Sequence, residues 1–81
     1  AFIAEENGVK AGEMTYSKAG EDKIIIDHTE VNSEFNGQGV GKKMVLAAVE
    51  YARESGIKIL PLCPFAKATF DKNKDIQDVL V

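Results

Sequence analysis

The chain has 81 residues, of which 44% are hydrophobic and 28% charged, a composition that excludes a disordered segment and fits one folded domain. A net charge of −3 and an isoelectric point near 5.0 exclude the basic surface that a general nucleic-acid binder needs. The single cysteine excludes an internal disulfide, and no apolar run reaches the ~20 residues needed to span a bilayer. These features predict one domain over residues 1–81, located in the cytoplasm, with no nucleic-acid or membrane partner.

The first part of the chain predicts antiparallel strands. Residues 1–5 and 9–18 flank Asn7-Gly8, a dipeptide that strongly favours a two-residue hairpin turn. After a polar turn, residues 23–31 contain three consecutive isoleucines. Such a run predicts a central strand that is buried on both faces.

The second part of the chain predicts a crossover. Residues 40–55 repeat apolar side chains at helical spacing, and Gly56 is a typical helix stop. Residues 57–63 form a second apolar strand close behind this helix, so the two strands are expected to be parallel. Residues 65–74 predict a short helix, and the closing residues 78–81 predict an edge strand.

Pro61 interrupts the second apolar strand, where it removes a hydrogen-bond donor that a central strand needs. We therefore expect the parallel strands to part near this residue and to open a cleft at the C-terminal edge of the sheet, where ligands of open parallel sheets usually bind. The predicted fold class is α+β or α/β. It combines a mixed sheet with N-terminal antiparallel hairpin strands, one βαβ unit with splayed parallel strands, and a short C-terminal helix.

Residues 35–44, FNGQGVGKKM, place three alternating glycines and two lysines at the start of the predicted helix. The first backbone N–H groups of a helix are unpaired, and glycines let a phosphate approach them closely. Lys42 and Lys43 oppose the helix dipole unless an anion lies there. The spacing matches neither a Rossmann fingerprint nor a P-loop. The pattern favours a phosphate-binding turn, with tight packing of the turn as the alternative.

The glycine segment resembles the pyrophosphate loop of the GNAT acetyltransferase superfamily, Q/R-x-x-G-x-G/A, with Asn36 in place of the usual Gln or Arg. The segments IDHTEV, EFNGQGVGKKMV, YARESG and CPFAKATF…DVLV resemble a minimal subfamily of small N-acetyltransferases over about residues 9–81. The resemblance implies a GNAT-like fold with acetyl-CoA or CoA as co-substrate. It implies a strand bulge and pantetheine contacts around Thr29 to Val31. It also implies pyrophosphate contacts from the backbone N–H groups of Gln38, Gly39, Val40, Gly41, Lys42 and Lys43.

Acetyl transfer needs a deprotonated amine, a polarised carbonyl and a proton for the leaving thiolate. Many GNAT enzymes supply that proton from a tyrosine, but the corresponding stretch here, Ala68-Thr69-Phe70, contains none. The candidate catalytic residues are instead His28 and Cys63, near the C-terminal ends of the two strands that flank the predicted cleft. A thiol beside a histidine can act as a nucleophile or as a proton source, although each residue also fits a packing role. One histidine and one cysteine are too few ligands for a metal site.

The sequence thus predicts an acetyl-CoA-dependent N-acetyltransferase for an unidentified amine acceptor. The alternative is a CoA-binding module with little or no catalytic activity, and a generic nucleotide-phosphate binder ranks third. Asp27, Glu30 and Glu34 are candidates for receiving the amine, and Phe65 and Phe70 are expected to anchor the short helix to the sheet.

Overall fold

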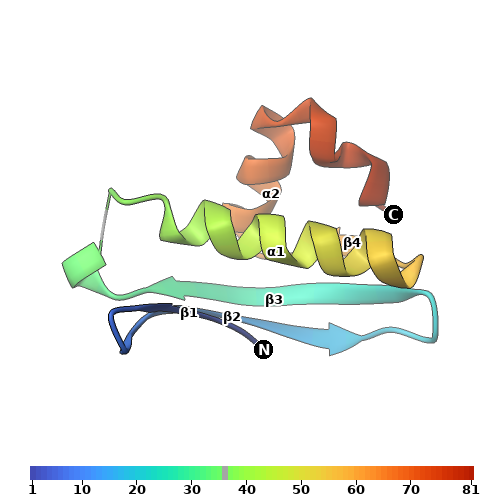
Figure 1. Ribbon diagram of the computed structural model, residues 1–81. Helices are drawn as coiled ribbons and strands as arrows, with labels where there is room; N and C mark the ends of the chain where they lie inside the picture. Colours follow the sequence, from blue (N-terminus) through green and yellow to red (C-terminus); the bar gives the residue numbers. More distant parts are fainter. Residues whose placement is uncertain (36) are drawn as a thin grey trace.

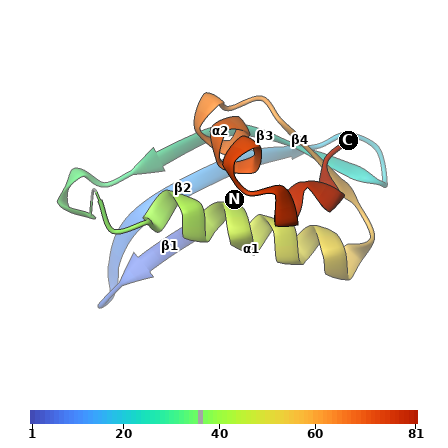
Figure 2. The ribbon, with the colours of Figure 1, turned by 90° about the horizontal axis from the view of Figure 1, so that it is seen from above.

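The computed structural model describes residues 1–35 and 37–81. Four strands form one sheet in the order β1-β2-β3-β4. The strands are β1 (Phe2–Glu6), β2 (Val9–Lys18), β3 (Lys23–Val31) and β4 (Lys58–Pro61). The helices are α1 (Val40–Ser55) and α2 (Pro64–Lys72), with 3-10 turns η1 (Ser33–Phe35) and η2 (Lys74–Val79). Both α-helices lie on the same face of the sheet, which leaves the other face open (Figures 1 and 2).

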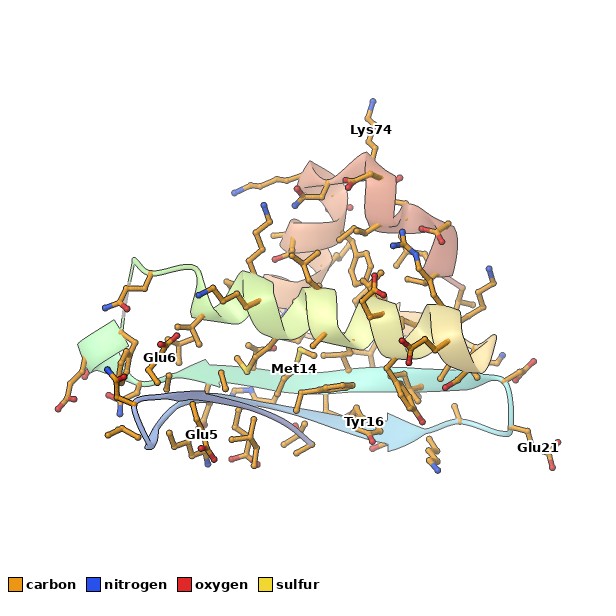
Figure 3. All side chains as sticks on the ribbon, in the orientation of Figure 1. Glu5, Glu6, Met14, Tyr16, Glu21 and Lys74 are labelled. Carbon is orange, nitrogen blue, oxygen red and sulfur yellow. The ribbon has the colours of Figure 1, made fainter. Side chains whose placement is uncertain are left out.

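The predicted hairpin is confirmed. Asn7 and Gly8 have φ angles of 52° and 80°, and positive values at both positions are what a type I′ turn requires. The turn places Glu6 opposite Val9, and the two strands pair antiparallel. Figure 3 shows the resulting alternation, with Met14 between the sheet and α1 and other side chains on the open face.

The central strand β3 has the predicted bounds, but only one of its faces is covered. Ile24 and Ile26 are buried, whereas Ile25 between them is only half-buried. Successive side chains of a strand point to opposite faces, and both helices cover the same face, so Ile25 lies on the open one. The prediction that this strand is buried on both faces is therefore wrong.

Helix α1 also has its predicted bounds, and it supplies much of the core. It ends at Gly56, whose φ of 67° is the left-handed conformation typical of a helix C-terminus. The helix packs closely on Gly12 of β2, where an added Cβ would lie 3.0 Å from Met44 Cε and 3.2 Å from Val40 Cγ1. None of the helices in the described residues is long and apolar enough to cross a membrane.

The C-terminal segment departs from the prediction in one respect. Helix α2 occupies Pro64–Lys72, close to the predicted range, but residues 78 and 79 continue the 3-10 turn η2, so residues 78–81 do not form the predicted edge strand. Only Leu80 forms a bridge to Ile59, and the Val81 N–H donates to the Ile59 carbonyl at 3.1 Å. Buried Ile76 and Val79 belong to η2, so burial of these two side chains outweighs strand pairing.

Arg53 ties η2 to α1. Its guanidinium donates to both carboxylate oxygens of Asp78, at 2.7 and 3.1 Å, and to the Asp75 carbonyl at 2.9 Å. We expect Arg53→Met to accelerate amide hydrogen exchange in η2 about threefold or more, because a bidentate pair to an exposed segment controls local opening more than global stability. Exchange in the β2–β3 pair, which Arg53 does not contact, is the internal control. An equal acceleration in both regions would contradict a local role.

Candidate functional site

Strands β3 and β4 part at the predicted place. Their parallel pairing ends where Ile26 lies opposite Pro61. Beyond this point β3 continues to Val31, whereas β4 ends and its chain turns into α2. The N–H groups of Leu62 and Cys63 both donate to the Ile26 carbonyl, at 3.1 and 3.2 Å, and close the pairing. The last part of β3 therefore has a neighbouring strand, β2, on one side only.

Two residues direct their backbone polar groups to the side that β4 has left. The Asn32 N–H donates to the Ala11 carbonyl of β2 at 2.7 Å. Backbone groups alternate in direction along a strand, so those of Thr29 and Val31 point away from β2. No strand of the described residues pairs with this stretch of the edge. Thr29 and Val31 are therefore placed to pair with an extended ligand.

The strand bulge lies at Asp27, which has no partner on β2 although Ile26 and His28 do. The family resemblance implied a bulge around Thr29 to Val31, so the bulge lies slightly earlier than expected. The extra residue switches the alternation of side chains. After buried Ile26, it is Thr29 and Val31 that face the helices.

Cys63 is the N-cap residue of α2 and only 4% exposed. Its Sγ lies 3.4 Å from Thr29 Oγ1, in the space between the parted strands. Burial acts to raise the pKa of the thiol, but contacts with the Thr29 hydroxyl and with the N–H groups of Ala66, Phe65 and Thr29 outweigh it, and the pKa is lowered. A helix N-terminus favours a thiolate for the same electrostatic reason.

The structure does not bring His28 to Cys63. His28 is exposed on the opposite face of the sheet from Thr29, and its Nε2 lies 3.1 Å from the carboxylate of Glu30 on that same face. The thiol is instead influenced by Thr29 and by the start of α2. Among the residues that the structure describes, no group of three His, Cys, Asp or Glu side chains is placed to hold a metal ion.

The glycine turn presents backbone N–H groups at the start of α1, and several of them have no backbone acceptor in residues 1–35 and 37–81. Gly39 is the N-cap residue, with φ 73° and ψ 19°. Two of the six N–H groups assigned to pyrophosphate already have acceptors: Gln38 donates to the Phe35 carbonyl at 3.3 Å and Lys43 to the Gly39 carbonyl at 3.0 Å. The other four find no backbone acceptor among the described residues, and they belong to Gly39, Val40, Gly41 and Lys42. Asn36, where the family pattern has Gln or Arg, lies outside the described residues.

A pocket of about 180 Å³ opens at this turn. Its walls come from the end of β3, η1, the glycine turn and the first turn of α2, with Val31, Phe35, Gly37, Gly39, Val40, Gly41, Lys42 and Phe65 as lining residues. Phe70 is buried and anchors α2 as predicted, but Phe65 is 43% exposed and lies over α1, so its predicted role as a second anchor to the sheet is wrong.

These features suit a phosphorylated ligand with a long, amide-containing arm. The four N–H groups that have no backbone acceptor among the described residues suit its phosphates, as does the exposed Lys42. Lys43 is also exposed and adds charge nearby, although its Nζ lies 3.8 Å from the Glu6 carboxylate. The edge at Thr29 and Val31, where no described strand pairs, suits its amides, and Cys63 lies beside that edge with its thiol in contact with the Thr29 N–H.

Comparison with known proteins agrees with this geometry. Residues 1–79 match the family model described as GCN5-related N-acetyl-transferase. The NMR solution structure of a "GCN5-like putative N-acetyltransferase" from Staphylococcus aureus is 42% identical, with a TM-score of 0.78 over 99% of this chain and 78% of that one. No curated protein matches the chain. The fold is thus shared with the matched solved structure, and the chain belongs to the GCN5-related N-acetyltransferase family.

Proposed function

We propose that the protein is an acetyl-CoA-dependent N-acetyltransferase in which Cys63 is the reacting residue. The observation that carries this proposal is the position of the Cys63 thiol. It lies at the start of α2, against Thr29, in the gap between the parted strands β3 and β4. Family membership supports the reaction class, and the geometry supports the choice of residue.

The chain has separate groups for each part of the co-substrate. The N–H groups from Gly39 to Lys42, which have no backbone acceptor in the part of the chain that the structure describes, would hold the pyrophosphate, with Lys42 and Lys43 adding positive charge. The backbone groups of Thr29 and Val31 would pair with the amides of the pantetheine arm. When bound, the co-substrate supplies an acetyl group activated as a thioester.

Cys63 is suited to accept that acetyl group. Its lowered pKa increases the thiolate fraction, and the thiolate is the nucleophilic form. Attack forms a bond from Sγ to the acetyl carbon and breaks the thioester bond, so CoA leaves as a thiolate that takes a proton from water. An unprotonated amine then attacks the acetyl-Cys63 thioester. A C–N bond forms, the Sγ–carbon bond breaks, and the amine proton passes to water.

A CoA-binding module with little catalysis is the second candidate. The exposed position of His28 favours the binding module. His28 does not contact Cys63, so it is not placed to take the proton of an amine that attacks there. The stretch Ala68-Thr69-Phe70 offers no tyrosine to replace it. Both candidates share the CoA site, and transfer of an acetyl group to Cys63 distinguishes them.

Calorimetric titration with CoA tests the shared site. We expect saturable binding at one CoA per chain, and we expect the double variant Lys42→Gln/Lys43→Gln to bind about tenfold more weakly with a smaller salt dependence, because two charges near the phosphates are lost. Lys74→Gln is the matched control, since Lys74 lies on η2 away from the glycine turn (Figure 3). Absence of saturable binding to the unaltered protein would contradict the proposed function.

A further inference from the structure

The ring of Phe65 rests directly on the backbone of Gly41. A Cβ added to Gly41 would lie 2.4 Å from Phe65 Cζ and 2.6 Å from Cε1, far inside van der Waals contact. Gly41 is not among the glycines with positive φ and belongs to helix α1, so its backbone conformation does not require glycine. The absence of a side chain at this position is therefore explained by the ring, which joins the first turn of α1 to the first turn of α2.

Phe65 also belongs to the wall of the pocket at the glycine turn, and it follows Cys63 by two positions in the chain. Phe65 lines the pocket at the turn, whereas Cys63, the N-cap residue of α2, is buried and does not line it. A ligand held at the turn thus has no open path to the Cys63 Sγ in this conformation. Of the residues that line the pocket, only Phe65 belongs to α2, and its side chain is partly exposed. Its ring can turn aside by side-chain rotation alone.

We propose that Phe65 is a gate between the glycine turn and Cys63, closed when its ring rests on Gly41 and open when the ring turns toward solvent. The inference rests on the proposed function, because it is the co-substrate that must reach both places. In the closed state the thiol is shielded from solvent and from other electrophiles. A reagent reaches the thiol only in the open state. The observed rate of any reaction at Cys63 is therefore proportional to the fraction of molecules in that state.

Alkylation of Cys63 by iodoacetamide, in the absence of CoA, measures this gate. We expect Phe65→Ala to raise the second-order rate constant about fivefold or more, because the variant has no closed state. The midpoint of the pH–rate profile should stay in place or move to lower pH, because the Thr29 hydroxyl and the backbone N–H groups that lower the thiol pKa are kept, while any loss of burial weakens the influence that raises it. Leu46→Ala, which removes an exposed apolar side chain from α1 away from the pocket, is the control and keeps the original rate.

Gly41→Ala tests the contact between the Phe65 ring and Gly41 without removing the ring. The added methyl group forces the ring off Gly41, so alkylation is expected to accelerate about twofold or more. Alanine has a higher helix propensity than glycine, so faster alkylation with unchanged thermal stability is not explained by unfolding. In the Phe65→Ala background the same substitution has nothing to displace and leaves the rate unchanged.

Three results would overturn the gate: an unchanged rate in Phe65→Ala, an unchanged rate in Gly41→Ala, or an additive effect in the double variant. In Phe65→Ala, a rate constant that is raised only below the pH midpoint and is unchanged above it would assign the change to the thiol pKa and would likewise overturn the gate. None of these measurements uses CoA. Calorimetric binding of CoA to the unaltered protein tests the proposed function separately, so failure of one is distinguishable from failure of the other.

Discussion

Replacing Cys63 by alanine is expected to reduce acetyl transfer by roughly 100-fold or more, equal to about 2.7 kcal/mol of transition-state stabilisation. CoA binding is expected to stay within about twofold, because the proposed binding groups are backbone N–H groups and lysines elsewhere. Incubation with acetyl-CoA in the absence of an amine should add one acetyl group to the unaltered protein and none to Cys63→Ala. Intact-protein mass spectrometry measures this directly.

Thr29 supplies a matched pair of variants for the same prediction. Its hydroxyl lies 3.4 Å from the thiol and lowers the thiol pKa, so more thiolate is present at a given pH than in a free cysteine peptide. Thr29→Val keeps the shape and removes the hydroxyl, so the midpoint of the pH–rate profile for acetylation of Cys63 should move to higher pH. Thr29→Ser keeps the hydroxyl and should leave the midpoint near its original value. A fully active Cys63→Ala variant would contradict the covalent role, and CoA binding without any acetylation of Cys63 would favour the binding module.

Local patterns predicted the elements that carry the site. The bounds of α1 follow from a continuous apolar stripe that ends at Gly56, and those of β3 from an apolar run between polar turns. Pro61 predicted where β3 and β4 part, because proline lacks the N–H donor that strand pairing needs at that position. In each case the decisive information lies within a few residues of the feature.

The faces of the strands were less predictable. The bulge at Asp27 has no marker in the local sequence, yet it switches the alternation of every later residue in β3. Without knowing the position of the bulge, one cannot tell from the sequence whether His28 or Thr29 lies beside Cys63. For the same reason the Thr29 hydroxyl, which contacts the thiol, was missed as a candidate residue while its backbone was included.

Tertiary contacts set a second limit on what could be predicted from the sequence. Three isoleucines in a row do not reveal that both helices pack on one face of the sheet, so Ile25 was expected to be more deeply buried than it is. The contact of Phe65 with Gly41 joins two segments that are far apart in sequence, and each residue by itself fits a different explanation. A glycine beside a phosphate-binding turn suggests ligand approach, whereas at Gly41 the structure shows a packed ring.

Gly39 is the glycine at which phosphate approach itself is best tested. We expect Gly39→Val to weaken CoA binding about tenfold or more, or roughly 1.4 kcal/mol. Among the described residues its N–H has no backbone acceptor, and none of them lies within 4 Å of an added Cβ. The valine side chain would thus project into open space at the helix N-terminus, where the pyrophosphate is proposed to lie, without disturbing the packing of the protein.

Backbone strain is the competing explanation, because Gly39 has φ 73° and a β-branched residue strongly disfavours that conformation. Gly37→Val is the matched control. Gly37 has φ 81° and also nothing within 4 Å of an added Cβ, but it precedes the N-cap and is not one of the proposed donors. Equal losses of affinity in the two variants would assign the effect to strain in the turn. A loss confined to Gly39→Val, with circular dichroism unchanged in both, would locate the phosphates at the start of α1, and an unchanged affinity would exclude them from it.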